Sequence, residues 1–355
     1  MKSFSLSEAL QRLKSSLFPI SQIVIAAMLS YFIARYGLGH PVPLLAVTVA
    51  VSSLGFTRDT RPQRVASIAT AMVLGIAISE ALLLTFGEGV LQLGFALTLA
   101  LTAARFVSKN PSFALVVATQ TVLVQLLDAP TGGVFARSID GLLGGIIALL
   151  FTALAPRNPV KLARKDAKQL FEVFRFTLED LRSVLQSPDQ QKADRALERI
   201  RQTQPLIDSW RESLDSALSI SRISPFYRWA EKELEEQKRV LRGMDLATRN
   251  LRVVTRRADY LIRDNRPRHE LAQLLTKVIA SVDLVEQSIS DFSIAQKARK
   301  YLKKYSVTLS PNAFKETLNV SDTALLMQIR PMWVDLCLAA GMDPKEAIEL
   351  LPKVD

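Results

Sequence analysis

The sequence predicts an all-α membrane protein with six transmembrane helices followed by a cytosolic helical bundle. Two observations support this fold class. First, charge is divided unevenly: 17 of the first 158 residues are Lys, Arg, Asp or Glu, compared with 62 of the remaining 197. Average proteins carry about a quarter of charged residues, so the two halves lie on opposite sides of that value. Second, the first half holds six apolar runs with at most one acidic residue each. We therefore expect a membrane domain over 1–158 and a cytoplasmic α-helical domain over 159–355.

The six apolar runs are the expected transmembrane helices, and they lie at 17–36, 42–57, 65–86, 90–106, 112–127 and 138–155. A bilayer core requires about 20 apolar residues, so the first and third runs are long enough and the others are slightly short. Backbone groups in lipid must bond within the segment, which makes each run a helix. A secretory signal before a soluble domain is the alternative for the first run, but five further runs favour an uncleaved helix.

Lys and Arg in the short loops predict the orientation. Basic residues gather at the N-terminus, in the second and fourth connections and after the sixth run, for example Lys14, Arg61, Lys109 and Lys161. Because such residues remain cytoplasmic, both termini are expected inside and the chain in the cell inner membrane. The net charge of +11 is then mostly this asymmetry, so we expect no nucleic-acid partner.

A small-residue ladder occurs twice, each time after an arginine. Arg64 is followed by Ser67, Ala71, Gly75 and Ser79, and Arg137 by Asp140, Gly144, Ala148 and Thr152, with Gly141 and Gly145 beside the second ladder. Small residues every four positions allow close helix packing, the simplest role for Ser67, Ala71, Gly75, Gly141, Gly144 and Gly145. The two ladders begin on opposite sides of the membrane, which predicts a 3+3 inverted repeat of the kind found in secondary transporters.

The two ladders, R-P-Q-R-V-A-S-I-A-T-A-M-V-L-G and R-S-I-D-G-L-L-G-G-I-I-A-L-L, resemble the fusaric acid resistance and aromatic acid exporter superfamily over residues 15–160. The plan of six helices and a helical tail is similar to that of the plant aluminium-activated malate channels. The resemblance implies transport of organic, often aromatic, carboxylate anions by a homodimer or higher homo-oligomer. The Gly-Thr pair usual in the family is replaced by Ser67-Ile68 and Asp140-Gly141, so the substrate chemistry need not be the same.

Polar residues inside the runs are the candidate site, because charge within a bilayer is costly and marks function. Arg64 and Arg137 are expected to bind the substrate carboxylate, since guanidinium pairs with it bidentately. Arg64 as a topology anchor and Arg137 as a local partner of Asp140 are the alternatives. Gln120 and Gln125 are further candidate substrate ligands, or simple interhelical hydrogen bonds. Glu80 and Asp140 are candidates for proton coupling, although Glu80 lies near enough to the helix end to reach water.

Enzyme chemistry is not expected. One cysteine, Cys337, and two distant histidines provide no metal centre or catalytic triad, and no phosphate-binding loop occurs. We expect no metal and no cofactor.

The charged half shows helical periodicity, with long helices expected at 160–186, 189–220, 226–263 and 268–304 and a kink at Pro205. In the last, a heptad seam runs through Leu271, Leu275, Val278, Val282, Val285, Ile289 and Phe292. The arginines between Arg252 and Arg268 are candidates for contact with anionic lipid, or for a solvated face. A final segment with Trp333 and Cys337 is expected to cover the bundle.

The predicted function is export or channel-like passage of organic anions. The alternative is a membrane-anchored scaffold whose tail recruits envelope or division partners.

Overall fold

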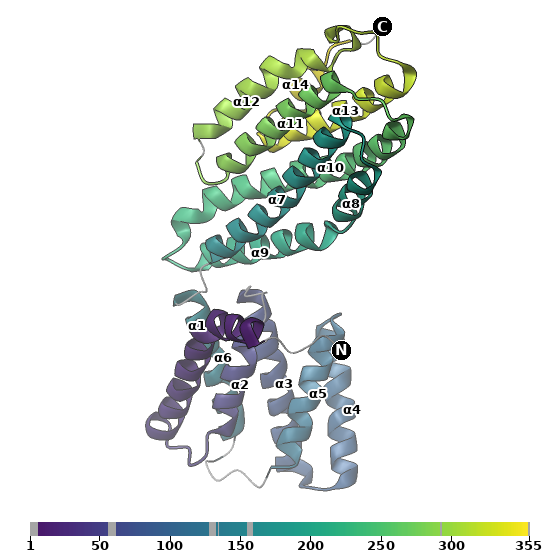
Figure 1. Ribbon diagram of the computed structural model, residues 1–355. Helices are drawn as coiled ribbons and strands as arrows, with labels where there is room; N and C mark the ends of the chain where they lie inside the picture. Colours follow the sequence, from purple (N-terminus) through teal and green to yellow (C-terminus); the bar gives the residue numbers. More distant parts are fainter. Residues whose placement is uncertain are drawn as a thin grey trace. The chain divides into compact units, whose positions relative to one another are not determined.

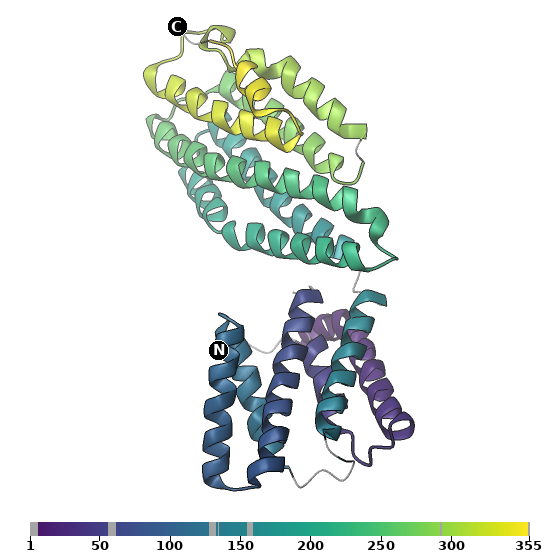
Figure 2. The same ribbon diagram turned by 180° about the vertical axis from the view of Figure 1, so that it is seen from behind.

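The computed structural model describes residues 6–55, 62–127, 133, 135–154, 159–291 and 293–353. The regular elements of this described part are all helical, without a β-strand. The chain divides into two compact units, each considered by itself below. The membrane unit comprises Met1–Asn158 with Ser219–Arg228, and the charged unit comprises Pro159–Leu218 with Trp229–Asp355. Figures 1 and 2 show the helices of both units from opposite sides.

The membrane unit contains the helices that the apolar runs predicted: α1 (Leu6–Phe32, continued by a π-helical turn at Ile33–Gly37), α2 (Leu44–Leu54), α3 (Pro62–Phe86), α4 (Val90–Val107), α5 (Pro111–Gln125) and α6 (Ala136–Leu154). Four stretches are long and apolar enough to cross a membrane: Ser16–Gly37, α3, α4 and α6. α2 and α5 are apolar but shorter, with 11 and 15 residues. The structure thus supports a multi-pass chain with four candidate spans and two shorter apolar helices.

α3 lies at the centre of the membrane unit and packs against α2, α4, α5 and α6. Three pairs of contacts correspond when the first three helices are exchanged with the last three, whereas the packing of α2 on α3 has no comparable counterpart between α5 and α6. α1 packs on α2 as α4 packs on α5, α2 on α6 as α5 on α3, and α1 on α6 as α4 on α3. Figure 1 shows α3, α4 and α5 side by side, with α1, α2 and α6 grouped next to them.

Glycines of both ladders lie where two backbones approach closely. A Cβ atom on Gly75 would collide with the carbonyl of Val117 in α5, and one on Gly144 with the carbonyl of Ala46 in α2. Gly141 and Gly145 pack instead on Ile76 and Ala69 of α3. Among the remaining ladder residues, Ala71 is fully buried whereas Ser67 is exposed. Gly75 and Gly144 therefore allow a close approach that a larger side chain would obstruct.

The charged unit is a bundle of α7 (Pro159–Gln186), α8 (Gln190–Arg201), α9 (Gln204–Ile223), α10 (Glu231–Leu261), α11 (His269–Ser288), α12 (Ser293–Tyr305), α13 (Val320–Ala339) and α14 (Pro344–Glu349). The predictions of single long helices over 189–220 and 268–304 were wrong, because the structure divides each into two helices. Pro205 begins α9 rather than kinking a continuous helix, since proline is tolerated in a first turn. The helix expected over 268–304 stops after Ser288, and Asp291 accepts a hydrogen bond from the Ser293 amide where α12 begins.

The heptad seam forms part of the core of this unit. Leu271, Leu275, Val278, Val282, Val285 and Ile289 are all buried, whereas Phe292 lies outside the described residues. Trp333 and Cys337 were expected in a covering segment, but both are fully buried in α13. α13 packs along α10, and Gly243 allows the approach because a Cβ atom at this position would collide with the backbone of Ala339. α13 is therefore a core helix.

Asp335 in α13 is an acidic residue within this core, 8% exposed, and its Oδ2 accepts a hydrogen bond from Asn250 at 2.6 Å. Burial raises the pKa of Asp335 to about 6. Because the pKa of Asp335 is higher in the folded than in the unfolded state, its favourable contribution to the free energy of unfolding is complete below the ordinary pKa of aspartate. This contribution is lost as the pH rises through about 6. Asp335→Asn should therefore stabilise the protein at pH 8 by up to about 3 kcal/mol and have little effect at pH 4.

Thermal unfolding of the full-length protein at both pH values tests this expectation. The matched control is Asp194→Asn, since Asp194 is exposed on α8 and carries no buried charge. Equal changes of the melting temperature at pH 4 and pH 8 in the Asp335 variant would contradict the expected linkage.

Candidate functional site

Four ionisable side chains lie together near the start of α6, within an otherwise apolar helix pack. Glu80 comes from α3, Arg137 and Asp140 from α6, and His40 from the segment before α2. Glu80, Asp140 and His40 are 1%, 4% and 9% exposed. Because charged groups are expensive within a membrane protein, four of them at one place form the candidate functional site.

The Glu80 carboxylate lies on the first turn of α6. Its Oε1 accepts the backbone N–H of Arg137 at 3.1 Å. Its Oε2 accepts the backbone N–H of Ser138 at 2.9 Å and the Ser138 hydroxyl at 2.6 Å. The first amides of a helix have no partner within the helix, and the positive end of the helix dipole favours an anion there. Glu80 therefore caps α6 from a neighbouring helix and does not extend to water.

The side chain of Arg137 contacts the other kind of helix end, the C-terminal end of α5. Its guanidinium donates to the carbonyl of Val124 at 3.1 Å and to that of Leu127 at 3.4 Å, where α5 ends. The last carbonyls of a helix lack partners within it and favour a cation. The α3–α6 and α5–α6 contacts at this point are thus fixed by opposite charges on opposite helix ends.

Asp140 pairs with His40, which the sequence reasoning did not select. His40 Nδ1 lies 2.6 Å from Asp140 Oδ1, across 100 residues of sequence. The backbone N–H of His40 also donates to the Ala34 carbonyl at 3.1 Å, which holds this segment in place. The local pairing of Arg137 with Asp140 was one alternative, but the hydrogen-bond partner that the structure gives Asp140 is His40. The signal available in the sequence was that His40 and Arg137 lie in loops on the same expected side of the membrane.

Arg64 is not brought to this cluster. It lies in the first turn of α3, partly exposed, and is 16 residues from Glu80 on the same helix. At 1.5 Å per residue the two positions are about 24 Å apart along the axis. Arg64 and Arg137 therefore cannot bind the two oxygens of one small carboxylate.

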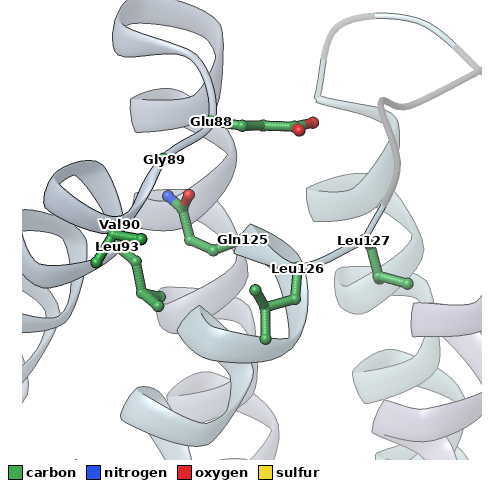
Figure 3. Close-up of a pocket in the computed structure, with 7 residues that line it drawn as sticks. All are labelled: Glu88, Gly89, Val90, Leu93, Gln125, Leu126 and Leu127. Carbon is green, nitrogen blue, oxygen red and sulfur yellow. The ribbon is translucent and has the colours of Figure 1, made fainter.

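The two glutamines of α5 occupy different environments. Gln125 is buried at the end of α5, and with Glu88, Leu126 and Leu127 it lines a pocket of about 410 Å³. Figure 3 shows the Gln125 amide directed toward the turn that carries Glu88 and Gly89. Gln120 lies deeper, beside Gly75, and its Oε1 has no hydrogen-bond partner among the described residues. The pocket adjoins the cluster through Leu127, whose carbonyl accepts from Arg137.

The cluster lies within a region that matches a known family. Residues 25–151 match the sequence profile described as "Fusaric acid resistance protein-like", and this range includes His40, Glu80, Arg137 and Asp140. This region is similar to the fusaric acid resistance-like family. The resemblance seen in the two ladders is therefore confirmed for the membrane unit. The family is one of transporters rather than enzymes, and with the apolar helices it supports a multi-pass membrane location.

Curated relatives are similar to part or nearly all of the chain. An uncharacterized protein of Corynebacterium glutamicum is 27% identical over 355 residues, covering 98% of this chain and 91% of its own length. Proteins of Mycobacterium tuberculosis and Mycobacterium bovis that bear the name "Putative arylamide transporter" are 28% identical over 184 residues. That match covers 50% of this chain and 52% of the mycobacterial proteins, so this chain spans about half of their length. Together with the family, these relatives support a membrane transporter.

Proposed function

We propose that this protein exports small organic anions, with aromatic carboxylates as the first substrate class, through the helix pack of the membrane unit. The observation that carries the proposal is the buried cluster of Glu80, Arg137, Asp140 and His40. Four ionisable groups in an apolar pack are costly for stability alone, and such groups mark substrate and proton pathways. The family and the mycobacterial relatives support the transporter class.

The proposed architecture is six membrane crossings built as two inverted three-helix repeats, with both termini cytoplasmic and two or more copies per assembly. Three corresponding pairs of helix contacts support the repeat: α1–α2 with α4–α5, α2–α6 with α5–α3, and α1–α6 with α4–α3. Two crossings would be short, since α2 and α5 have 11 and 15 residues. Short or interrupted segments at corresponding positions of two repeats are typical of transporter binding sites.

Arg137 is proposed as the positive charge that attracts the substrate anion. Its guanidinium donates to the carbonyl of Leu127, and Leu127 lines the pocket together with Gln125 and Glu88. The Gln125 amide donates to the Ser79 carbonyl of α3 at 3.5 Å, and its second N–H can donate to a carboxylate or pair with an amide. The name of the mycobacterial relatives makes arylamides the second class of substrate to test. Asp140 with His40 is the proposed proton-carrying pair, while Glu80 is assigned to holding α6.

Flux into proteoliposomes of the purified full-length protein tests the proposal. The substrates are a labelled aromatic carboxylate, a dicarboxylate and an arylamide, each measured with and without a pH gradient. Arg137→Gln is expected to lower carboxylate flux by about 10- to 100-fold, since a hydrogen bond to a charged group is worth about 1.5–3 kcal/mol.

Arg105→Gln is the matched control, because Arg105 is exposed at the end of α4 and donates to the carbonyl of Lys109 at 3.0 Å. Its flux should equal that of the unmodified protein. Arg64→Gln should lower the carboxylate flux less than Arg137→Gln does. Absence of flux for every substrate would favour the scaffold hypothesis. Equal flux in the Arg137 and Arg105 variants would remove Arg137 from the pathway.

A further inference from the structure

The segment between α9 and α10 has an unusual surface. Residues 222–232 read R-I-S-P-F-Y-R-W-A-E-K, and positions 226–229 are three aromatic residues and one arginine. Ile223, Phe226 and Trp229 are 48%, 60% and 68% exposed. Trp210 and Trp333, the other two tryptophans of the sequence, are fully buried. Large apolar side chains clustered on a surface mark a partner or a membrane.

The same segment is basic. Arg222, Arg228 and Lys232 are exposed beside the aromatic residues, and Glu231 is the one acidic residue among these eleven positions. Tryptophan and tyrosine are enriched at membrane–water interfaces, where an apolar ring and a polar edge are both accommodated. Basic side chains next to them are attracted to the anionic headgroups of the cytoplasmic leaflet. The composition therefore fits a lipid headgroup region better than a purely apolar protein partner.

The position of the segment in the chain supports the same partner, because residues 222–228 belong to the membrane unit and residues 229–232 to the charged unit. Arg164, in the second turn of α7, donates to both carboxylate oxygens of Glu233, at 2.7 and 2.8 Å. Glu233 follows the segment directly, so the last residues of the segment, which belong to the charged unit, lie at the end of that unit where α7 begins. α7 begins at Pro159, only a few residues after Leu154, where the candidate span α6 ends. The chain itself therefore tethers this end of the unit close to a bilayer.

The basic run that the sequence pointed to is used differently. Arg252 donates to the Ile200 carbonyl and the Thr203 hydroxyl, and the buried Arg268 pairs with Asp264 and Asp322. Arg263 pairs with Asp259 and lies over the ring of Tyr260. Arg252 and Arg268 are thus engaged within the bundle, whereas Arg256, Arg257 and Arg266 are exposed. Segment 222–232 is the stronger candidate for lipid contact because it combines exposed basic residues with the exposed side chains of Phe226 and Trp229.

We propose that segment 222–232 is an interfacial membrane anchor, with Phe226 and Trp229 in the headgroup region and Arg222, Arg228 and Lys232 on anionic phospholipids. The anchor would hold the charged unit against the membrane independently of what the protein transports. Each buried aromatic side chain adds apolar contact area, and each basic residue adds attraction that salt weakens.

Spin labelling of the full-length protein in nanodiscs of phosphatidylethanolamine and phosphatidylglycerol tests the anchor. Phe226→Cys and Val320→Cys place a nitroxide on the segment and on an exposed apolar position in the charged unit, since Val320 is 87% exposed. Cys337 does not compete for the label, because it is fully buried and burial raises the pKa of its thiol to about 12. The label at 226 should be relaxed strongly by oxygen and weakly by a water-soluble nickel chelate, with the reverse at 320.

Two outcomes would overturn the proposal. A label at 226 with the same accessibility as the label at 320 would place the segment in water. A label at 226 shielded from both oxygen and nickel would place it against protein, either a second copy or another part of this chain. Adding Arg228→Gln and Lys232→Gln should raise nickel accessibility at 226, and so should nanodiscs without phosphatidylglycerol.

A second measurement uses the unaltered protein and does not depend on the cysteine variants. Brominated phospholipids quench tryptophan at the interface, and Trp229 is the exposed tryptophan of the three. Quenching should be clear in the unmodified protein and largely absent in Trp229→Phe. Equal quenching in the two proteins would contradict insertion of this residue.

Discussion

Replacing Glu80 by alanine is expected to destabilise the membrane unit by several kcal/mol. The Glu80 carboxylate is 1% exposed and accepts two backbone N–H groups and the Ser138 hydroxyl at the start of α6. Each buried donor left without an acceptor costs about 1–3 kcal/mol, and water is not at hand to replace the lost bonds. The expected result is a lower melting temperature and a smaller yield of monodisperse protein in detergent. Glu88→Ala is the control for stability, because Glu88 is an exposed acid eight residues further along.

Glu80→Gln separates the cap from a proton carrier. Glutamine retains one side-chain oxygen that can accept from the first turn of α6, so it should recover most of the stability lost in Glu80→Ala. If Glu80 serves as a cap, the flux of Glu80→Gln should keep its response to a pH gradient. If Glu80 carries the proton, that response should disappear while the protein remains folded. Asp140→Asn, measured beside it, should lose the pH response under our assignment.

Much of the membrane unit could be predicted because its determinants are local. Runs of apolar residues and the spacing of Gly75 and Gly144 are visible in sequence, and the helices and close contacts follow from them. The cluster could not be predicted as a set. Glu80 lies 57 residues from Arg137, and His40 lies 100 residues from Asp140, so only the packing of α3 and α2 against α6 brings them together. Arg64 shows the reverse case, since its sequence pattern matches that of Arg137 while its place on α3 keeps it about 24 Å away.

The charged unit shows where periodicity alone is insufficient. The seam from Leu271 to Ile289 correctly identifies a buried helix face, because burial repeats with the helical period. The same period continues past Ser288 as far as Phe292, so it does not reveal the break, which depends on the local hydrogen bond of Asp291 with Ser293. Trp333 and Cys337 likewise look like a covering segment in sequence. Their place in the core depends on the long-range packing of α13 against α10.

Arg268→Ala is expected to be the most destabilising substitution in the charged unit, costing about 3–5 kcal/mol. The Arg268 side chain is 5% exposed and pairs with Asp264 and with Asp322 at the start of α13. It also donates to the carbonyl of Arg266 at 2.8 Å. Its removal leaves Asp322, 14% exposed, without its guanidinium partner and disconnects the turn before α11 from α13. Arg268→Lys should recover part of the loss, because lysine provides the charge without the planar fork.

The pH dependence of this effect has a definite sign. Hydrogen bonds from Arg268 lower the pKa of Asp264 to about 2. Because the pKa of Asp264 is lower in the folded than in the unfolded state, its pairing with Arg268 stabilises the folded protein fully above the ordinary carboxyl pKa. This stabilisation is lost as the pH falls through about 2. The difference in melting temperature between the unmodified protein and Arg268→Ala should therefore be constant from pH 5 to 8 and narrow below about pH 4. Arg266→Ala, at an exposed neighbouring arginine, should show no comparable loss. An equal loss in both variants would mean that net charge, rather than the buried contacts of Arg268, governs the stability of this turn.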